Sequence, residues 1–303
     1  MDYGPLQEEL RKLAKARNAL IIAHNYQRAE VQDAAHFTGD SLELSRMAAK
    51  TDADIILFCG VEFMAETAYI LSPDKKVLLG DINAGCPMAD MITSYDLRKL
   101  KEEHPGALVV AYVNTSAAVK AETDICCTSA NAATVVSNIP KDREIIFVPD
   151  RNLALYVEKA TGRELIKWDG FCPTHEYITA EVIIAAKKKH PEALVIAHPE
   201  CLPEVQDMAD SLQSTSGMIR FAKESEAKSF IIATEMGLNH RLQKENPDKE
   251  FISPTKKAIC PNMKLTTLQK AFDTLHQERY EIRVEEEIRL RALKAVEAMV
   301  SYT

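Results

Sequence analysis

The sequence lacks the features that would place it among membrane, secreted or nucleic-acid-binding proteins. It has no run of about 18 apolar residues, which is the length that a bilayer span requires. Its first residues, MDYGPLQEELRKLAKARNAL, are polar and contain no apolar segment typical of a secretory signal. Positive charge is not in excess either, because the 303 residues carry a net charge of −8, which argues against broad contact with nucleic-acid phosphates. We therefore expect a cytoplasmic protein that acts on small molecules, without a membrane or nucleic-acid partner.

The sequence also lacks the even number of cysteines that a disulfide framework requires. Seven cysteines in a chain without a secretory signal favour metal or catalytic use of some thiols over disulfides. Cys59, Cys126 and Cys127 end apolar runs, where free cysteine usually acts as a small buried hydrophobe, and Cys201 is interpreted in the same way. The other three each precede a proline, in the segments CPMAD, CPTH and CPNMK: Cys86, Cys172 and Cys260.

The three Cys-Pro pairs lie 86 and 88 residues apart, and other segments recur at nearly the same interval. The apolar runs LIIAH, LVVAY and LVIAH end at His24, Tyr112 and His198, with steps of 88 and 86 residues. A second set of apolar runs is IILFCG, EIIFVPD and SFIIATE. Between the runs, SLELSRMAAK, SYDLRKLKEE and ITAEVIIAAKKK place apolar side chains at helical spacing. Alternating strands and helices predict parallel sheets covered by helices on both faces.

The predicted fold class is α/β, with three similar α/β/α units whose parallel sheets are related by a pseudo-threefold axis. The expected units are residues 1–88, 89–174 and 175–262. The tail, residues 263–303, is expected to form two helices, or a helix and a strand, and to complete unit one by packing back on it. No low-complexity linker separates the units, so we expect them to pack tightly.

Polar residues follow the first strand of each predicted unit. In open parallel sheets, ligands bind beyond the carboxyl ends of the strands. Any one of these residues alone is typical of an ordinary polar loop, but three equivalent positions in register favour the polar floor of a binding site. The candidates are His24, Tyr26, Tyr112, Asn114, His198 and Glu200.

Three hydroxyl residues, Ser41, Ser129 and Thr215, recur at the same steps of 88 and 86 residues, at expected helix starts. They could simply cap the helices, which is worth about 1 kcal/mol each. Hydroxyls and free amides at a helix N-terminus also bind anions. Three such positions facing one centre would hold carboxylates or a phosphate without many lysines or arginines.

A pseudo-threefold arrangement would also bring Cys86, Cys172 and Cys260 together. Three thiolates suit zinc, or an iron–sulfur cluster in which one iron has no cysteine ligand. On this reasoning the candidates are a Cys₃ zinc protein and an iron–sulfur enzyme, including a (de)hydratase or lyase.

Further motifs accompany the Cys-Pro segments along the chain, namely AHNYQ, GDSLELSR, GVEFMAETA, YVNTSA, CTSANA, PDRNLA, HPEC, STSGM and ATEMGLNHRL. With these motifs the chain resembles a known family, the quinolinate synthases, which are the A protein of NAD biosynthesis. The resemblance covers roughly residues 20 to 275 and implies an oxygen-sensitive [4Fe–4S] cluster at the centre of three α/β domains. It also implies that iminoaspartate and dihydroxyacetone phosphate condense to quinolinate with loss of phosphate and two waters, and a functional link to an L-aspartate oxidase.

The resemblance also implies roles for individual residues. The three Cys-Pro cysteines would hold the cluster, and we expect its open iron to act as a Lewis acid. Tyr26 and Glu200 are predicted to be the acid–base pair, with His24 and His198 in reserve because imidazole titrates nearest to neutral pH. The implied cavity lining is His24, Tyr26, Ser41, Tyr112, Asn114, Ser129, His198, Glu200 and Thr215.

One position departs from the longer pattern of the family. Some members carry a C-x-x-C-x-x-C run at the last cysteine, whereas this chain has Met263 where the second cysteine would lie. Regulation by a disulfide in that run is therefore not expected. The Met263 thioether is expected to give an apolar wall beside the cluster.

Overall fold

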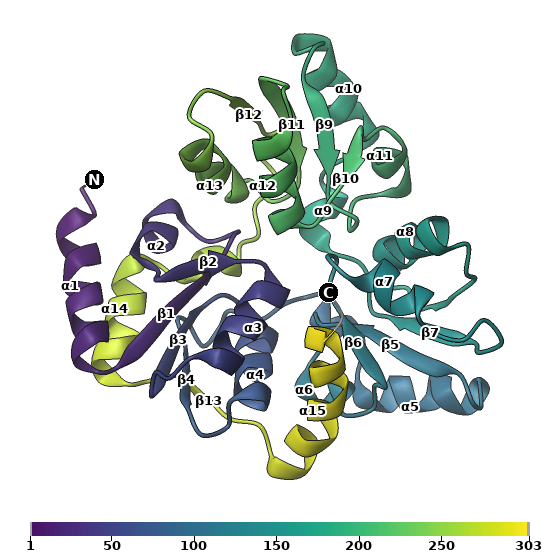
Figure 1. The fold of residues 1–303 in the computed structure, drawn as a ribbon, viewed down its shortest axis with the longest axis horizontal. Coiled ribbons are helices and arrows are strands. Elements are labelled where there is room, and N and C mark those ends of the chain that lie inside the picture. Colours follow the sequence, from purple (N-terminus) through teal and green to yellow (C-terminus); the bar gives the residue numbers. More distant parts are fainter. Residues whose placement is uncertain (1, 302–303) are drawn as a thin grey trace.

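The structure is a computed structural model that describes residues 2–301. Figure 1 shows three lobes arranged around a common centre, each with one sheet and helices packed against it. Within the described residues, no helix is both long and apolar enough to cross a membrane.

The three sheets share one strand order. In each unit the first strand lies between the second and the third, and the fourth pairs with the third, as in β2-β1-β3-β4. These twelve strands pair in parallel, which confirms the predicted α/β fold with three parallel-sheet units. The strands are β1 (Ala19–His24), β2 (Phe37–Gly39), β3 (Ile55–Cys59), β4 (Lys76–Leu79), β5 (Leu108–Tyr112), β6 (Ile125–Cys127), β7 (Ile145–Val148), β8 (Ile166–Lys167), β9 (Leu194–Ala197), β10 (Ser211–Leu212), β11 (Ser229–Ala233) and β12 (Glu250–Ile252).

The central strands are buried on both faces, as the apolar runs predict. In β1, Ile22 packs in one apolar cluster and the adjacent Ile21 packs in another on the opposite face of the sheet. Because side chains alternate across a strand, a continuous apolar run satisfies two layers of helices at once.

The helices of the three units surround these sheets, and the three predicted amphipathic helices are present as α3, α5 and α10. Unit one has α1 (Gly4–Ala16), α2 (Ala29–Ala34), α3 (Ser41–Lys50) and α4 (Glu62–Leu71). Unit two has the 3₁₀ turn η1 (Ala89–Met91), α5 (Ser94–Glu103), α6 (Ala117–Lys120), α7 (Ala132–Ser137) and α8 (Arg151–Thr161), and the short helix α9 (Pro173–Glu176) crosses its expected boundary with unit three. Unit three has α10 (Ala180–Lys189), α11 (Pro203–Asp207), α12 (Thr215–Glu224) and α13 (Leu238–Glu245), and the 3₁₀ turn η2 (Met263–Leu265) begins the tail.

The C-terminal tail contacts two units. Its helix α14 (Leu268–Gln277) packs against α1 and α2, and its strand β13 (Glu281–Ile282) adds an antiparallel edge to β4. The last helix, α15 (Glu286–Ser301), lies against α4 of unit one and against α6 and β6 of unit two (Figure 1). The tail therefore extends the sheet of unit one and also joins that unit to unit two.

A buried side-chain donor braces the turn after the first strand of units one and three. Gln32 lies eight residues after His24, and its Nε2 donates to the carbonyl oxygens of Asn25 and Gln27 at 3.1 and 2.9 Å. Gln206, eight residues after the equivalent His198, bonds the two equivalent carbonyls of unit three. These bonds hold the polar strand ends in place because they satisfy carbonyls that would otherwise be buried without a donor.

Unit two has a lysine at the equivalent position. Lys120, eight residues after Tyr112, is fully buried, and its ammonium donates to the carbonyl of Thr115. The ammonium also lies 5.4 Å from the centre of the Phe63 ring. Burial lowers the pKa of Lys120, and the nearby Glu66 carboxylate opposes that effect.

Replacing this lysine tests the bracing role. Lys120→Met is expected to lower the free energy of unfolding by about 1–3 kcal/mol, because the Thr115 carbonyl loses its donor and Glu66 loses its cation. Lys120→Gln is expected to cost clearly less, since a glutamine amide makes this bond in the other two units. Urea unfolding of the two variants and the parent protein measures the difference. Equal losses in both variants would contradict the bracing role.

Candidate functional site

One cavity lies where the three units meet. It has about 680 Å³ of empty space, its opening included. All twelve candidate residues from the sequence line this cavity. They belong to three units, and the first and the last of them are nearly 240 residues apart in the chain. They are His24, Tyr26, Ser41, Cys86, Tyr112, Asn114, Ser129, Cys172, His198, Glu200, Thr215 and Cys260.

Each Cys-Pro pair begins a short helical turn at the cavity. Proline fixes φ near the helical value and lacks an N–H, so it suits the first position of such a turn. The turn brings the backbone N–H three residues later toward the sulfur. Cys86, Cys172 and Cys260 accept in this way from Ala89, His175 and Met263, respectively.

The three cavity thiols fit a group that binds thiolates. Burial raises the pKa of Cys86 to about 12 and raises the pKa of Cys172 and Cys260, and the negative charge of the neighbouring thiolates adds to the rise for Cys86 and Cys172. Thiols that repel one another as anions become stable thiolates when a metal centre binds them together. Three soft sulfur donors with backbone N–H bonds suit an iron–sulfur cluster or zinc.

The other four cysteines do not line this cavity. Cys59 lies in β3, and Cys126 and Cys127 lie in β6, all fully buried. Cys201 is also buried, and its thiol donates to the carbonyl of Ala233 at 3.2 Å. Burial raises the pKa of all four thiols.

The histidines at two strand ends adopt the same local arrangement. Nδ1 of His24 accepts from the backbone N–H of Tyr26 at 3.1 Å, and Nδ1 of His198 accepts from that of Glu200 at 3.2 Å. Burial lowers the pKa of His24 to about 3 and that of His198 to about 4, so both rings are neutral at pH 7. With Nδ1 accepting, the ring proton is on Nε2. His198 donates it to Ser129 Oγ at 3.1 Å.

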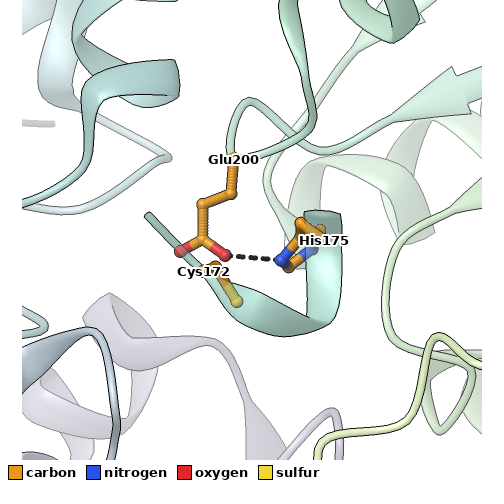
Figure 2. Close-up of side chains that lie close together, drawn as sticks. All are labelled: Cys172, His175 and Glu200. Atoms are coloured by element: carbon orange, nitrogen blue, oxygen red, sulfur yellow. Dashed lines mark ion pairs between the residues drawn. The ribbon is translucent and has the colours of Figure 1, made fainter. Parts of the chain in front are cut away.

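Glu200 lies beside Tyr112 and beside His175, with which it forms the ion-pair contact drawn in Figure 2. Its Oε2 is 2.8 Å from Nδ1 of His175, and the Tyr112 hydroxyl also bonds its carboxylate. Burial acts to raise the pKa of Glu200, but these contacts and the nearby histidines lower it overall. Glu200 is therefore an ionised carboxylate at neutral pH.

A chain of polar contacts connects Tyr26 with Glu200. The Tyr26 hydroxyl lies 2.5 Å from Thr234 Oγ1, which lies 2.9 Å from Nε2 of His175. His175 therefore lies between Thr234 and the Glu200 carboxylate, with Nε2 on the side of Thr234 and Nδ1 on the side of Glu200. Burial raises the pKa of Tyr26 well above its usual value, so its hydroxyl keeps its proton.

Cys172, His175 and Glu200 could also hold a metal ion by themselves. One ligand atom from each lies within 4.8 Å of the others (Figure 2). Both ring nitrogens of His175 are engaged by protein groups in this arrangement. A metal ion there would have to replace one of those contacts.

The hydroxyl residues Ser41 and Thr215 are the first residues of α3 and α12, but other side chains cap these helices. Asp40 caps α3 and Ser214 caps α12, each by accepting a backbone N–H. Simple capping therefore does not explain the two hydroxyls. Ser129 lies in the turn before α7, where its hydroxyl bonds His198.

Asn114 presents an unpaired acceptor at the cavity. Its Oδ1 is buried and has no hydrogen-bond partner among residues 2–301. A buried amide oxygen without a donor is costly, so a ligand N–H or O–H at this position would be stabilised.

The sequence interpretation missed several polar residues of the site, chiefly His175, Thr234 and Glu235. Glu235 is buried, and its carboxylate accepts the backbone N–H of Cys260 at 3.1 Å and pairs with Lys264 at 3.0 Å. The ammonium of Lys264 also donates to the carbonyl of Tyr26, which ties unit one to the Cys260 segment. No sequence signal singled out His175, because its position three residues after Cys172 donates to the sulfur through the backbone, which any residue type can do.

Comparisons with known proteins identify the family of the chain. A family model described as Quinolinate synthetase A protein matches residues 8–301. A curated relative from Thermodesulfovibrio yellowstonii is 56% identical over 97% of both chains, and one from Geobacter metallireducens is 54% identical over 99% of both. A third, from Methanosarcina barkeri, is 51% identical over 99% of both, and all three are named quinolinate synthase. The chain therefore belongs to the quinolinate synthetase A family, whose members are enzymes of NAD biosynthesis.

Proposed function

We propose that the chain condenses iminoaspartate with dihydroxyacetone phosphate to quinolinate, releasing phosphate and two waters. The observation that carries this proposal is the cavity itself, where three cysteines from three units meet the polar ends of three equivalent strands. The names of the relatives support the same product.

Cys86, Cys172 and Cys260 would hold a [4Fe–4S] cluster. When bound by three cysteines, such a cluster supplies one iron that is free to act as a Lewis acid toward substrate oxygen atoms. The backbone N–H groups of Ala89 and Met263 would donate to two of the sulfurs. Met263 also lines the cavity and provides an apolar surface beside Cys260.

Proton transfer is assigned to Tyr26 and Glu200. The condensation needs a group that removes a proton from carbon and a group that delivers one to a departing hydroxyl. Glu200, held as a carboxylate by His175 and Tyr112, is suited to be the base. Tyr26, whose hydroxyl keeps its proton, is suited to be the donor. His24 and His198, neutral at pH 7, would act as hydrogen-bond donors through Nε2 more readily than as bases.

Anionic groups of the substrates would bind at the helix starts. The hydroxyls of Ser41 and Thr215 stand at the N-terminal ends of α3 and α12, where backbone N–H groups and the helix dipole favour negative charge. The unpaired Oδ1 of Asn114 would accept a hydrogen bond from a substrate hydroxyl or nitrogen. These contacts suit a phosphate ester and a dicarboxylate without a cluster of basic residues. Tyr112 and Ser129 would act indirectly, because the Tyr112 hydroxyl bonds Glu200 and the Ser129 hydroxyl bonds His198.

The proposed reaction needs a source of iminoaspartate. Iminoaspartate would be supplied by an L-aspartate oxidase, and both enzymes would act in the cytoplasm. The net negative charge and the small cavity suit small-molecule substrates, with no nucleic acid or membrane partner.

A mononuclear zinc site is the second candidate, and the grouping of Cys172, His175 and Glu200 favours it. In that case only one of the three cavity cysteines would need to bind the metal. A hydrolase or a (de)hydratase reaction would then replace the condensation.

Metal content and product formation decide between the two. Protein purified without oxygen and supplied with iron and sulfide is expected to contain about four of each per chain and to form quinolinate from the two substrates. The checks are iron, sulfide and zinc analysis and chromatography of the product. Zinc in place of iron, or an intact cluster without quinolinate, would count against the proposal.

The ligand assignment predicts a sharp division among the cysteines. Cys86→Ala, Cys172→Ala and Cys260→Ala are each expected to abolish the visible absorbance and the bound sulfide of the cluster, because each removes one of three ligands. Cys59→Ala and Cys201→Ala, matched buried controls, should keep both. Loss of the cluster in Cys201→Ala with retention in Cys172→Ala would show that the assignment is wrong.

The acid–base assignment predicts that Tyr26→Phe and Glu200→Gln each lower kcat by about 10²–10⁴-fold, because each removes one proton-transfer group. Both changes keep size and shape, so absorbance of the cluster and the melting temperature should stay near those of the parent protein. Tyr95→Phe, at an exposed tyrosine that does not line the cavity, is the matched control. Near-normal turnover in both variants would refute the assignment.

A further inference from the structure

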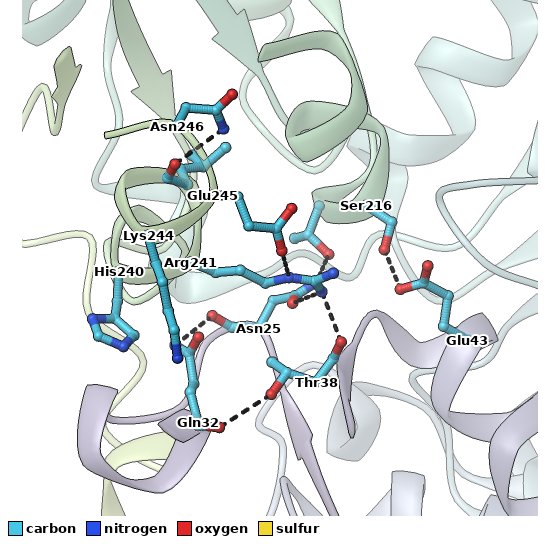
Figure 3. A network of polar contacts seen from close by, with 12 residues as sticks. Asn25, Gln32, Thr38, Glu43, Ser216, His240, Arg241, Lys244, Glu245 and Asn246 are labelled. Atoms are coloured by element: carbon cyan, nitrogen blue, oxygen red, sulfur yellow. Dashed lines mark hydrogen bonds and ion pairs between the residues drawn. The ribbon is translucent and has the colours of Figure 1, made fainter. Parts of the chain in front are cut away.

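The side chain of Asn25 connects two groups of unit three. Asn25 is fully buried directly after β1, and its Nδ2 donates to Thr215 Oγ1 at 2.9 Å. Its Oδ1 accepts from Nη1 of Arg241, on α13, at 2.9 Å (Figure 3). The same Nη1 donates to the carbonyl of Thr38 at 2.7 Å, while Nε of Arg241 bonds Glu245 at 2.7 Å.

The chemistry of the guanidinium fixes the direction of these bonds. Arginine can only donate, so the oxygen of the Asn25 amide must face it, and the amide nitrogen must face Thr215. The Thr215 oxygen is then an acceptor in that contact. Its own proton must point to another partner.

No protein group within residues 2–301 accepts that proton, since the Asn25 contact is the one hydrogen bond formed by the Thr215 side chain there. The residue lines the cavity and is almost fully buried. Ser214, not Thr215, caps α12, so the hydroxyl is not used by the helix. The free proton is therefore available to a ligand in the cavity.

We propose that Arg241 and Asn25 are positioning residues that orient the Thr215 hydroxyl as a hydrogen-bond donor to an anionic group of the substrate. The inference rests on the proposed function in one respect, namely that the ligand of the cavity is anionic. Arg241 is not among the residues that line the cavity, and it is paired with Glu245, so it acts by orienting Asn25 and not by its charge.

The arrangement also makes this donor depend on two units. Asn25 and Thr38 belong to unit one, whereas Thr215 and Arg241 belong to unit three. The nearby bond from Ser216 to Glu43, at 2.5 Å, joins α12 of unit three to α3 of unit one (Figure 3). The hydroxyl is oriented only where the two units are in contact.

Asn25→Asp is the most direct test, because it keeps nearly the same shape but reverses the donor and acceptor of the hydrogen bond with Thr215. The new carboxylate still accepts from Arg241, but it cannot donate to Thr215, so the threonine proton turns toward that carboxylate and away from the cavity. The dissociation constant of quinolinate, measured by equilibrium dialysis on the cluster-loaded protein without oxygen, is expected to rise about 10–100-fold. Thr215→Val, which lacks the hydroxyl, should give a similar rise, and Thr215→Ser should stay close to the parent protein.

A double-mutant cycle separates orientation from a general effect of the new charge. In the Thr215→Val background, Asn25→Asp is expected to weaken binding far less than it does alone, because the hydroxyl that it reorients is gone. Arg241→Met, which frees the Asn25 amide to turn over, should show the same dependence on Thr215 with a smaller rise. Glu245→Gln leaves the Arg241 to Asn25 bond in place and should bind as the parent does.

Additive effects of Asn25→Asp and Thr215→Val, or unchanged binding in Asn25→Asp, would overturn the inference. Inorganic phosphate serves as a second anionic probe in the same dialysis, so the test does not depend on quinolinate alone. A parent protein that forms no quinolinate, but whose phosphate binding follows the predicted cycle, would overturn the proposed function and leave the positioning roles supported.

Discussion

The structure depends on how the buried parallel strands end. A strand that is apolar on both faces must stop at the carboxyl edge of its sheet, and the turn that follows carries carbonyl groups into the interior. Gln32, Lys120 and Gln206 satisfy these carbonyls from equivalent positions in the three units. With the turns fixed in this way, the polar residues just after the strands are held rigidly enough to form a shared cavity.

Much of the fold could be predicted because its strongest elements are periodic. The first and third strands of each unit are continuous apolar runs, and α3, α5 and α10 show clear helical spacing. The edge strands β8 and β10 were not predicted, since two residues are too few to show any alternation. For the tail, a strand was one of two expectations, and the structure has two helices and the strand β13 there. Contact of α15 with unit two was also not predicted, because the apolar face of a helix does not indicate which neighbour it will cover. The exact unit boundaries stay a prediction.

The sequence predicted the site residues that recur at equivalent positions in the three units. It missed residues such as His175 that occur in one unit only. Three residues after the cysteines, the units have Ala89, His175 and Met263, so comparison of the units gives no reason to single out the histidine. Yet His175 connects Thr234 with Glu200. The roles of Ser41 and Thr215 were left open between capping and ligand binding, and only the positions of Asp40 and Ser214 in the structure remove the first explanation.

The tail strand β13 has a consequence for the order in which the protein can be completed during synthesis. Unit one is made first, but the edge of its sheet at β4 and the cover of its α1 face come from β13 and α14, near the end of the chain. Until those residues leave the ribosome, the first unit keeps an unpaired strand edge and exposed apolar surface, which are features that favour aggregation. The unit that is translated first is therefore the last to be finished.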